Sequence, residues 1–252
     1  MKVRAVPAVS RAIAIMRLLG SSETGLGVKA IADELDLIPS TCLHIVRALV
    51  EEGLLRFDPK TKRYSLGGGL VALARQVLSG GGFTYLAQPL LDQMAQKHNV
   101  IAMGVEVTPK LSALVLALSR SDQPFRLHTD VGSEFKTLES ATGRLIAAYS
   151  GLDWPELEKI FQSTQWDKAV SFDDWRLQVE QAKLQGWAID RDSFMVGLTV
   201  VAVPIFDLQR NLSHTLVAAG LSAHMGEAQV VSVLADLQAA AQEVLKGLYS
   251  TN

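Results

Sequence analysis

Polar side chains suited to contacting a nucleic acid lie on one face of a predicted helix that begins near residue 40. They are Ser40, Thr41, His44 and Arg47, with Leu43 at the edge of the face. Hydroxyl, imidazole and guanidinium groups can reach base edges or phosphates, and a leucine can touch a thymine methyl group. The same face could be the solvated side of an ordinary helix, because helix-turn-helix geometry is common among helical domains.

Two short helices must position that face. Apolar residues recur at helical spacing in the first of them: Val28, Ile31, Ala32 and Leu35. This helix should end by Ile38, because the residue before Pro39 is pushed out of the helical region. Ser40 or Thr41 is then expected to cap the second helix with its hydroxyl. The buried stripe of the second helix is predicted to be Cys42, Ile45, Val46 and Leu49.

A basic hairpin follows the second helix. Residues 54–57 predict one strand and residues 62–66 another, with Asp58 and Pro59 in the turn between them. The basic residues of this region are Arg56, Lys60, Lys62 and Arg63, and Lys29 lies on the outward face of the first helix. Such cations suit a phosphate backbone, although four basic residues could also serve solubility alone. Helix, turn, helix and basic hairpin in this order favour a winged helix-turn-helix over residues 1–67.

Charge is divided unevenly along the chain, whose formal net charge is -2. Residues 1–80 hold eleven Lys and Arg against seven Asp and Glu, whereas residues 81–252 hold thirteen against nineteen. A basic head on an acidic body fits a DNA-binding domain joined to a domain of another kind.

Cysteine usage and hydropathy indicate the compartment. The single cysteine, Cys42, excludes an intramolecular disulfide and fits the reducing cytoplasm. Its place on the apolar stripe favours a buried, inert thiol over a redox sensor. No stretch approaches the ~20 apolar residues of a membrane span, and Arg11 and Arg17 interrupt the only run that resembles a signal peptide. We therefore expect a cytoplasmic protein without membrane contact.

A linker is predicted over residues 68–82. Its apolar residues at helical spacing are Leu70, Leu73, Ala74 and Val77. The glycines at 80–82 carry a high entropic cost of ordering, so they predict a hinge. The apolar side of this linker helix could pair with a second copy of the chain or pack on its own winged domain.

The remaining residues, 83–252, alternate between helical and strand patterns. Helices are predicted over 83–98, 141–149, 154–162, 172–185 and 227–248. Strands are predicted over 100–107, 111–119, 125–131, 198–206 and 212–222. This order predicts an α+β domain, with an antiparallel sheet and helices around it.

Several short motifs resemble those of the IclR (isocitrate lyase regulator) family of bacterial transcription factors. In the first domain they are Val9–Ala12, Ser40–Thr41, Asp58–Pro59 and Arg63–Gly67. In the second they are Arg126–His128 with Val131–Gly132, Ser140–Arg144, and Gly186–Asp190 followed by Gly197, Pro204 and Phe206–Asp207. The resemblance covers roughly residues 6–248. Pro39 and His44 stand where the family often has a basic residue and an arginine. These two departures affect which operator sequence the chain is expected to bind, and they leave the expected fold unchanged.

The resemblance implies an architecture and partners. It implies a GAF-like effector-binding domain over residues 83–252 and a homodimer or a dimer of dimers. The expected partners are a palindromic operator in double-stranded DNA, with one half-site for each recognition helix, and a small-molecule effector. The effector would change the placement of the DNA-binding heads through the linker helix.

The resemblance also indicates which residues of this sequence would form the effector pocket. The family's loop before a small-residue helix corresponds to Ser140, Ala141, Thr142 and Gly143, and its acidic residue to Asp190. Members that bind small organic acids have a cysteine and two serines where this chain has Val200, Val217 and Ala219. Loss of three hydrogen-bonding groups would leave a small carboxylate poorly satisfied. We therefore expect a larger or more apolar effector, such as an aromatic compound.

Three polar side chains are still expected to be available in that pocket for contacts with the effector. They are Asp190, Thr199 and His128. The alternative is that Val200, Val217 and Ala219 fill the core and that the pocket is reduced or closed.

Catalytic patterns are weak in this sequence. None of the five histidines stands at metal-ligand spacing from another His or Cys, and no phosphate loop, nucleophile elbow or dinucleotide fingerprint is present. Asp190 and Asp192 could form an acid–base pair, but such carboxylates are more often loop caps or ligand contacts. We expect no enzyme activity, catalytic residue, metal or cofactor.

The sequence thus predicts a ligand-responsive DNA-binding transcriptional regulator of a bacterial operon. The operon would serve the catabolism of a small organic compound, with aromatic compounds among the candidates. The alternative is a ligand-binding or protein-interaction module whose winged helix contacts protein rather than DNA.

Overall fold

The computed structural model describes residues 6–79, 82–120, 129–135 and 138–249. The chain divides into two compact units, Met1–Leu78 and Ser79–Asn252, which we describe separately. Within the described ranges, no helix has both the length and the apolar character that a membrane crossing requires.

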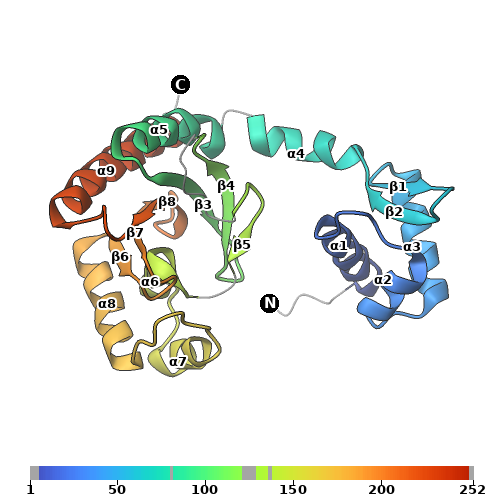
Figure 1. Ribbon diagram of the computed structural model, residues 1–252, viewed down its shortest axis with the longest axis horizontal. Helices are drawn as coiled ribbons and strands as arrows, with labels where there is room; N and C mark the ends of the chain where they lie inside the picture. The colour runs from blue at the N-terminus through green and yellow to red at the C-terminus, as the bar shows by residue number, and fades with distance from the viewer. Residues whose placement is uncertain (1–5, 80–81, 121–128, 136–137, 250–252) are drawn as a thin grey trace. The chain divides into compact units, whose positions relative to one another are not determined.

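The N-terminal unit is a winged helix-turn-helix (Figure 1). Its helices are α1 (Pro7–Gly20), α2 (Val28–Glu34) and α3 (Pro39–Glu51). Its hairpin pairs β1 (Leu55–Asp58) with β2 (Arg63–Leu66) in antiparallel register. The core lies between the helices and the hairpin and contains Ile15, Leu19, Ile31, Cys42, Val46, Leu49, Leu55 and Tyr64. The predicted order of helix, turn, helix and hairpin is confirmed.

The start of α3 differs from the prediction. Ile38 is the N-cap, Pro39 opens the helix, and no side chain makes a capping hydrogen bond. Ser40 and Thr41 lie inside the first turn, so the prediction that one of them caps α3 was wrong. Proline suits the first helical position because its fixed φ is already helical and its missing N–H would have no partner there. The helix therefore begins at Pro39, two residues earlier than it would with Ser40 as its cap.

A further helix, α4 (Gly69–Ser79), lies within the segment predicted as a linker. Val71 and Leu73 on this helix are exposed. Gly80 and Gly81 of the predicted hinge lie outside the described residues.

The C-terminal unit contains a six-stranded antiparallel sheet in the order β5-β4-β3-β8-β7-β6. Its strands are β3 (Ile101–Val107), β4 (Ala113–Leu118), β5 (Glu134–Phe135), β6 (Ala188–Arg191), β7 (Leu198–Phe206) and β8 (Leu212–Leu221). Its helices are α5 (Phe83–His98), α6 (Ser140–Tyr149), α7 (Trp154–Gln162), α8 (Phe172–Gln185) and α9 (Glu227–Tyr249). In Figure 1, α5 and α9 cover one face of the sheet, and α6 and α8 lie at the other. The predicted α+β class with an antiparallel sheet is confirmed.

Each face of the sheet has its own core. Val200 and Val217 face the core that contains Leu145 of α6 and Trp175 of α8. The neighbouring Val201 belongs to the opposite core, with α5 and α9. Successive strand residues point to opposite faces, so a strand buried on both sides gives a continuous apolar run. This explains why residues 198–206 and 212–222 contain so few polar positions.

Two details of the sheet differ from the sequence prediction. The strand predicted over 125–131 is absent from residues 129–131, and residues 125–128 lie outside the described ranges. A two-residue strand, β5, pairs with Ala113 and Leu114 instead. The second difference is β6, which was not predicted. Its four residues include Asp190 and Arg191, so its apolar content is too low for a strand pattern.

Candidate DNA-binding surface and ligand cavity

The outward face of α3 carries the residues predicted to contact DNA. Ser40, His44 and Arg47 are exposed, and Thr41 and Leu43 are half-buried. The opposite face is buried in the core of the unit and holds Cys42, Val46 and Leu49. The burial of that apolar stripe leaves the polar side chains of α3 in solvent. Lys29 is also exposed, on α2.

Two basic side chains of the hairpin are exposed to solvent, and a third forms hydrogen bonds within the unit. Lys60 and Lys62 are exposed near the turn. Arg63 donates from its guanidinium to Oγ1 of Thr24 at 2.9 Å and to the carbonyl oxygen of Gly25 at 3.5 Å. Arg63 therefore ties β2 to the segment between α1 and α2. If Arg63 also contacts phosphate, as the sequence predicts, it has a structural role and a DNA-binding role together.

Gly25 allows the close approach between these segments. Its φ is +68°, and a Cβ atom there would lie 2.6 Å from the carbonyl oxygen of Tyr64. Leu26 and Tyr64 then exchange backbone hydrogen bonds of 3.0 and 2.8 Å. The hairpin is thus fixed to the helical part of the unit by backbone contacts as well as by Arg63.

The turn of the hairpin is stabilised by Asp58. Its carboxylate accepts hydrogen bonds from the backbone N–H of Lys60 at 2.9 Å and from the hydroxyl of Thr61 at 2.7 Å. The bond from Thr61 is the main cause that lowers the pKa of Asp58. This carboxylate is used inside the turn, which leaves the charges of the neighbouring lysines directed to solvent.

Cys42 is buried in the core of the N-terminal unit. Its thiol lies 3.7 Å from the carbonyl oxygen of Val28, and burial raises its pKa. A thiol with a raised pKa holds little thiolate near neutral pH and reacts slowly. The geometry agrees with the interpretation of Cys42 as an inert core residue.

A cavity of about 280 Å³ lies in the C-terminal unit between the sheet and the start of α6. Most of its wall is apolar: Met103, Val105, Ala113, Phe135, Phe194, Met195, Leu198, Val200, Val217 and Ala219. Its polar lining residues are Thr129, Glu139, Ser140 and Thr142, and Gly143 completes the wall. Val200, Val217 and Ala219 thus line an open space rather than fill it. Their side chains offer a ligand only dispersion and hydrophobic contacts.

Hydroxyl groups supply most of the polarity of the cavity. Thr129 is 9% exposed, and its hydroxyl has no hydrogen-bond partner in the part of the chain that the structure describes. A buried hydroxyl without a partner is costly, so Thr129 is suited to bond a bound molecule. Ser140 and Thr142 lie in the first turn of α6, where backbone N–H groups lack partners within the helix. Glu139 is the one charged residue among the described lining residues.

Among the predicted pocket residues that the structure describes, three do not line the cavity. Ala141 is buried in the core behind it. Thr199 is fully buried, and its hydroxyl lies 3.0 Å from that of Ser222. Asp190 pairs with Arg144, at 2.8 Å between Oδ1 and Nη2. His128 lies outside the described residues.

The apolar walls contributed by β3 and by the segment after β6 were not predicted. Met103 and Val105 alternate along β3, and this spacing of two places them on one face of a strand. The sequence could therefore have assigned them to the same side as each other, but not to a cavity. Thr129 and Phe194 come from segments without a repeating pattern, which gives sequence reasoning no signal for them.

Asp192 caps the loop between β6 and β7 rather than pairing with Asp190. It accepts hydrogen bonds from the N–H of Gly197 and the hydroxyl of Ser222, both at 2.9 Å. The bond from Ser222 is the main cause that lowers the pKa of Asp192. Both carboxylates are therefore engaged in structural contacts. Across the described residues, no cluster of His, Cys, Asp and Glu could hold a metal ion.

Known proteins similar to this chain share both of its units. Residues 8–59 match the model of the IclR helix-turn-helix domain, and residues 75–246 match that of the bacterial transcriptional regulator IclR C-terminal domain. The glycerol operon regulatory protein of Streptomyces griseus is 26% identical over 211 residues, which cover 82% of each chain.

Solved structures show the same fold. A transcriptional regulator of this type from Alicyclobacillus acidocaldarius superposes with a TM-score of 0.84 at 22% identity, over 97% of this chain and 100% of that one. A homologue from Microbacterium hydrocarbonoxydans, solved with 4-hydroxybenzoate, has a TM-score of 0.78 at 18% identity, over 97% and 100% of the two chains.

Proposed function

This chain belongs to the IclR family of bacterial transcriptional regulators, and from that premise we propose that its DNA binding is controlled by an aromatic effector held in the cavity beside α6. The chain is a DNA-binding regulator, and the match of its first unit to the family's helix-turn-helix domain favours DNA over a protein partner for α3.

The apolar wall of the cavity is the observation that carries the aromatic assignment. Val200, Val217 and Ala219 offer no hydrogen bond, so a glyoxylate-sized acid would leave much of its polar surface unsatisfied there. A cavity of about 150 Å³ can hold a benzene ring. The volume of about 280 Å³ therefore has room for a ring with substituents.

Polar substituents on the ring have specific partners available. The unpartnered hydroxyl of Thr129 and the first turn of α6 lie on the cavity wall. Helix N-termini attract oxygen atoms that accept hydrogen bonds. The 4-hydroxybenzoate complex of the homologue from Microbacterium hydrocarbonoxydans supports the same chemical class, a ring with polar groups at its ends.

We further propose that the chain acts as a homodimer or a dimer of dimers on a palindromic operator. One recognition helix contacts too few bases for specific binding, so two copies of α3 would each occupy one half-site. The target would be an operon for the catabolism of the effector. Calibrated scattering of the free protein and of its DNA complex measures the number of chains bound.

Calorimetric titration tests the effector class. The panel contains 4-hydroxybenzoate and benzoate on one side and glyoxylate and pyruvate on the other. We expect binding of at least one aromatic compound and none of the two small acids. Tight binding of glyoxylate or pyruvate would overturn the assignment. A gel shift on the DNA upstream of this protein's own gene, with and without the compound that binds, tests the control of DNA binding.

A further inference from the structure

A buried ion pair stands directly behind the wall of the cavity. Arg144 of α6 and Asp190 of β6 lie 2.8 Å apart, with side chains 2% and 0% exposed. Neither residue lines the cavity. Burial lowers the pKa of Arg144, and the charge of Asp190 opposes that effect. Each charge thus stabilises the other in a site that water does not reach.

The two residues of the pair are hydrogen-bonded to two different segments of the cavity wall. Arg144 donates from Nη1 to the carbonyl oxygen of Ser140 at 2.7 Å. The second carboxylate oxygen of Asp190 accepts from the backbone N–H of Phe194 at 3.0 Å. Ser140 and Phe194 both line the cavity. The ion pair therefore connects the first turn of α6 with the segment after β6 through three consecutive contacts.

The backbone of Ser140 has an unfavourable conformation that the contact with Arg144 stabilises. Its φ is +57°, a left-handed conformation that costs energy for a residue other than glycine. Such a conformation persists when its surroundings fix it, and the guanidinium of Arg144 binds the carbonyl oxygen of that same residue. Arg144 is itself oriented by Gln178 of α8, whose side-chain oxygen accepts from Nε at 2.7 Å.

Stability alone gives a weak account of this arrangement. Buried ion pairs lose much of their Coulomb energy to desolvation, and apolar residues of similar size often replace them without loss of stability. The contacts of Arg144 and Asp190, in contrast, are directional and end on two residues of the cavity wall.

We propose that Arg144 and Asp190 are positioning residues for effector recognition, which set the distance between Ser140 and Phe194 in the cavity wall. The pair determines the shape that a ligand meets without touching the ligand. This inference rests on the proposed function only for the identity of the ligand, because the geometry that it explains is that of the cavity wall itself. It makes Asp190 a residue that supports the cavity wall, whereas the sequence predicted that Asp190 contacts the effector.

Backbone amide exchange measured by NMR tests the inference without any ligand. In Asp190→Asn the amide has one acceptor oxygen, which the charge of Arg144 attracts, so the N–H of Phe194 loses its partner. We expect exchange at Phe194 to rise roughly tenfold, the equivalent of about 1.4 kcal/mol. Amides in β7 and β8 should exchange at the wild-type rate. A uniform rise across the sheet, or no change at Phe194, would overturn the proposal.

A double variant separates positioning from stability. Arg144→Met with Asp190→Leu removes both charges, so neither is left unpaired. We expect it to keep the wild-type unfolding midpoint but to show faster exchange at Phe194 and in the first turn of α6. Arg176→Met is the matched control, because Arg176 pairs with Glu180 on the exposed side of α8, at 3.0 Å. Wild-type exchange at both positions in the double variant would refute positioning.

Ligand binding provides the second measurement. With 4-hydroxybenzoate as the probe, we expect the double variant to lose on the order of tenfold in affinity, the equivalent of about 1.4 kcal/mol, and Arg176→Met to lose none. If wild-type protein bound neither this probe nor benzoate, the proposed function would fail. The exchange measurement would then still decide the positioning role, so the two failures are distinguishable.

Discussion

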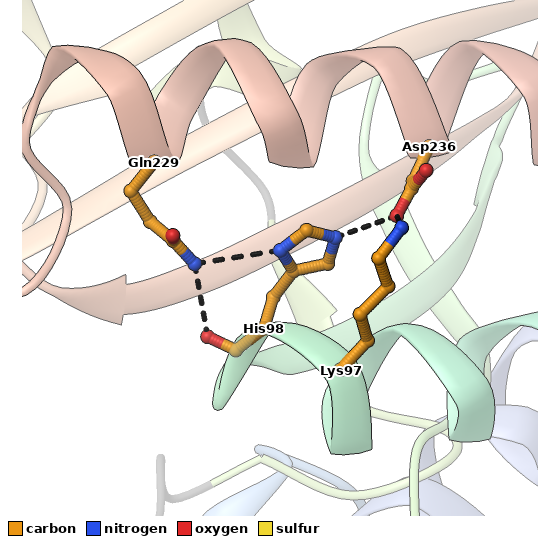
Figure 2. Close-up of polar contacts among 4 residues, drawn as sticks. All are labelled: Lys97, His98, Gln229 and Asp236. Carbon is orange, nitrogen blue, oxygen red and sulfur yellow. Dashed lines mark hydrogen bonds and ion pairs between the residues drawn. The ribbon is translucent and has the colours of Figure 1, made fainter.

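Nε2 of His98 lies 2.6 Å from Oδ2 of Asp236, which joins the end of α5 to the middle of α9 (Figure 2). Lys97 places its ammonium 2.6 Å from the same oxygen. On the other side of the ring, the amide nitrogen of Gln229 faces Nδ1 at 3.4 Å and donates to the carbonyl oxygen of His98 at 3.2 Å. This orientation makes Nδ1 the acceptor, so Nε2 carries a proton and donates to Asp236.

Removal of Asp236 should destabilise the C-terminal unit. The side chain of His98 is 4% exposed, so Asp236→Ala leaves a buried N–H donor without a partner. We expect the free energy of unfolding to fall by about 1–3 kcal/mol, measured by urea denaturation at pH 7. Glu243→Ala is the control, since it removes the same charge from an exposed position of α9. Equal losses in the two variants would contradict a specific contact.

The same contact should weaken in acid. Hydrogen bonds from Lys97 and then His98 are the main causes that lower the pKa of Asp236. An aspartate with a lowered folded pKa contributes stability above its unfolded pKa of about 3.9, and loses it as the pH falls through the folded pKa. The difference in stability between wild type and Asp236→Ala should therefore shrink as the pH falls below about 4. A difference that grew toward low pH would contradict this.

His214 should make stability depend on pH in a higher window. Its ring stacks on Phe83 with centroids 4.2 Å apart, and burial lowers its pKa to about 4. The unfolded chain binds this proton below about pH 6.5, whereas the folded chain does so only near pH 4. The contribution of neutral His214 to the free energy of unfolding is therefore at its full value above pH 6.5, and it falls as the pH decreases toward 4.

A phenylalanine at this position isolates the effect. His214→Phe keeps a ring beside Phe83 and removes the titration. Between pH 6.5 and 4, wild type should lose on the order of 2 kcal/mol relative to the variant, after allowance for partial solvent exposure. Thermal unfolding across this range measures the difference, in which the carboxylates common to both proteins cancel. Parallel curves would show that the folded ring titrates normally.

The sequence predicted the elements whose pattern alone determines them. The bounds of α5, α7, α8 and β7 agree with the prediction, because each has a long apolar period with a clear start and stop. In α8 the N-cap hydroxyl of Ser171 and the left-handed Gly186 mark the two ends. The positions of the buried strands followed in the same way from continuous apolar runs.

The site depended on contacts that no local pattern contains. The partner of Asp190 is Arg144, which is 46 positions away in the chain and belongs to another element. A buried carboxylate and a ligand-binding carboxylate look identical in a sequence. The hydroxyl of Thr199 was likewise expected to face a ligand and instead contacts Ser222. Only the three-dimensional structure distinguishes a polar group that lines a cavity from one that supports its wall.

Lys62 and Arg63 should affect DNA binding differently. Lys62 is exposed, so Lys62→Ala should weaken binding to all DNA sequences alike and reduce the salt dependence by about 0.9 in log–log slope. Arg63→Ala should in addition lower the unfolding free energy by about 1 kcal/mol, because it removes the contact with Thr24. Fluorescence anisotropy at several salt concentrations measures the slope. An unchanged slope in a variant that carries both Lys62→Ala and Arg63→Ala would refute phosphate contacts by the hairpin.

Arg47 should contribute base preference as well as affinity. It is exposed on the outward face of α3, one turn beyond His44. Arginine can bind guanine through two hydrogen bonds, and loss of such a contact costs about 1–3 kcal/mol at that base pair. Arg47→Ala should therefore weaken operator binding and relax the preference at one position in each half-site. The measurement is competition between the operator and its point variants, with Lys183→Ala of the other unit as the control. An equal loss on every sequence would assign Arg47 to the phosphate backbone.

A larger residue at position 219 should block the cavity and spare the fold. Ala219 of β8 pairs with Val200 and Ile101 and lines the cavity, whereas its neighbour Ala218 belongs to the core on the opposite face. Ala219→Leu places its extra carbons in open space, but Ala218→Leu forces them into a packed core at a cost of about 1–3 kcal/mol. We expect Ala219→Leu to keep wild-type stability and DNA binding while losing on the order of tenfold or more in affinity for an aromatic probe. Calorimetry and gel shifts on both variants measure these effects. Undiminished probe binding by Ala219→Leu would show that the effector binds elsewhere.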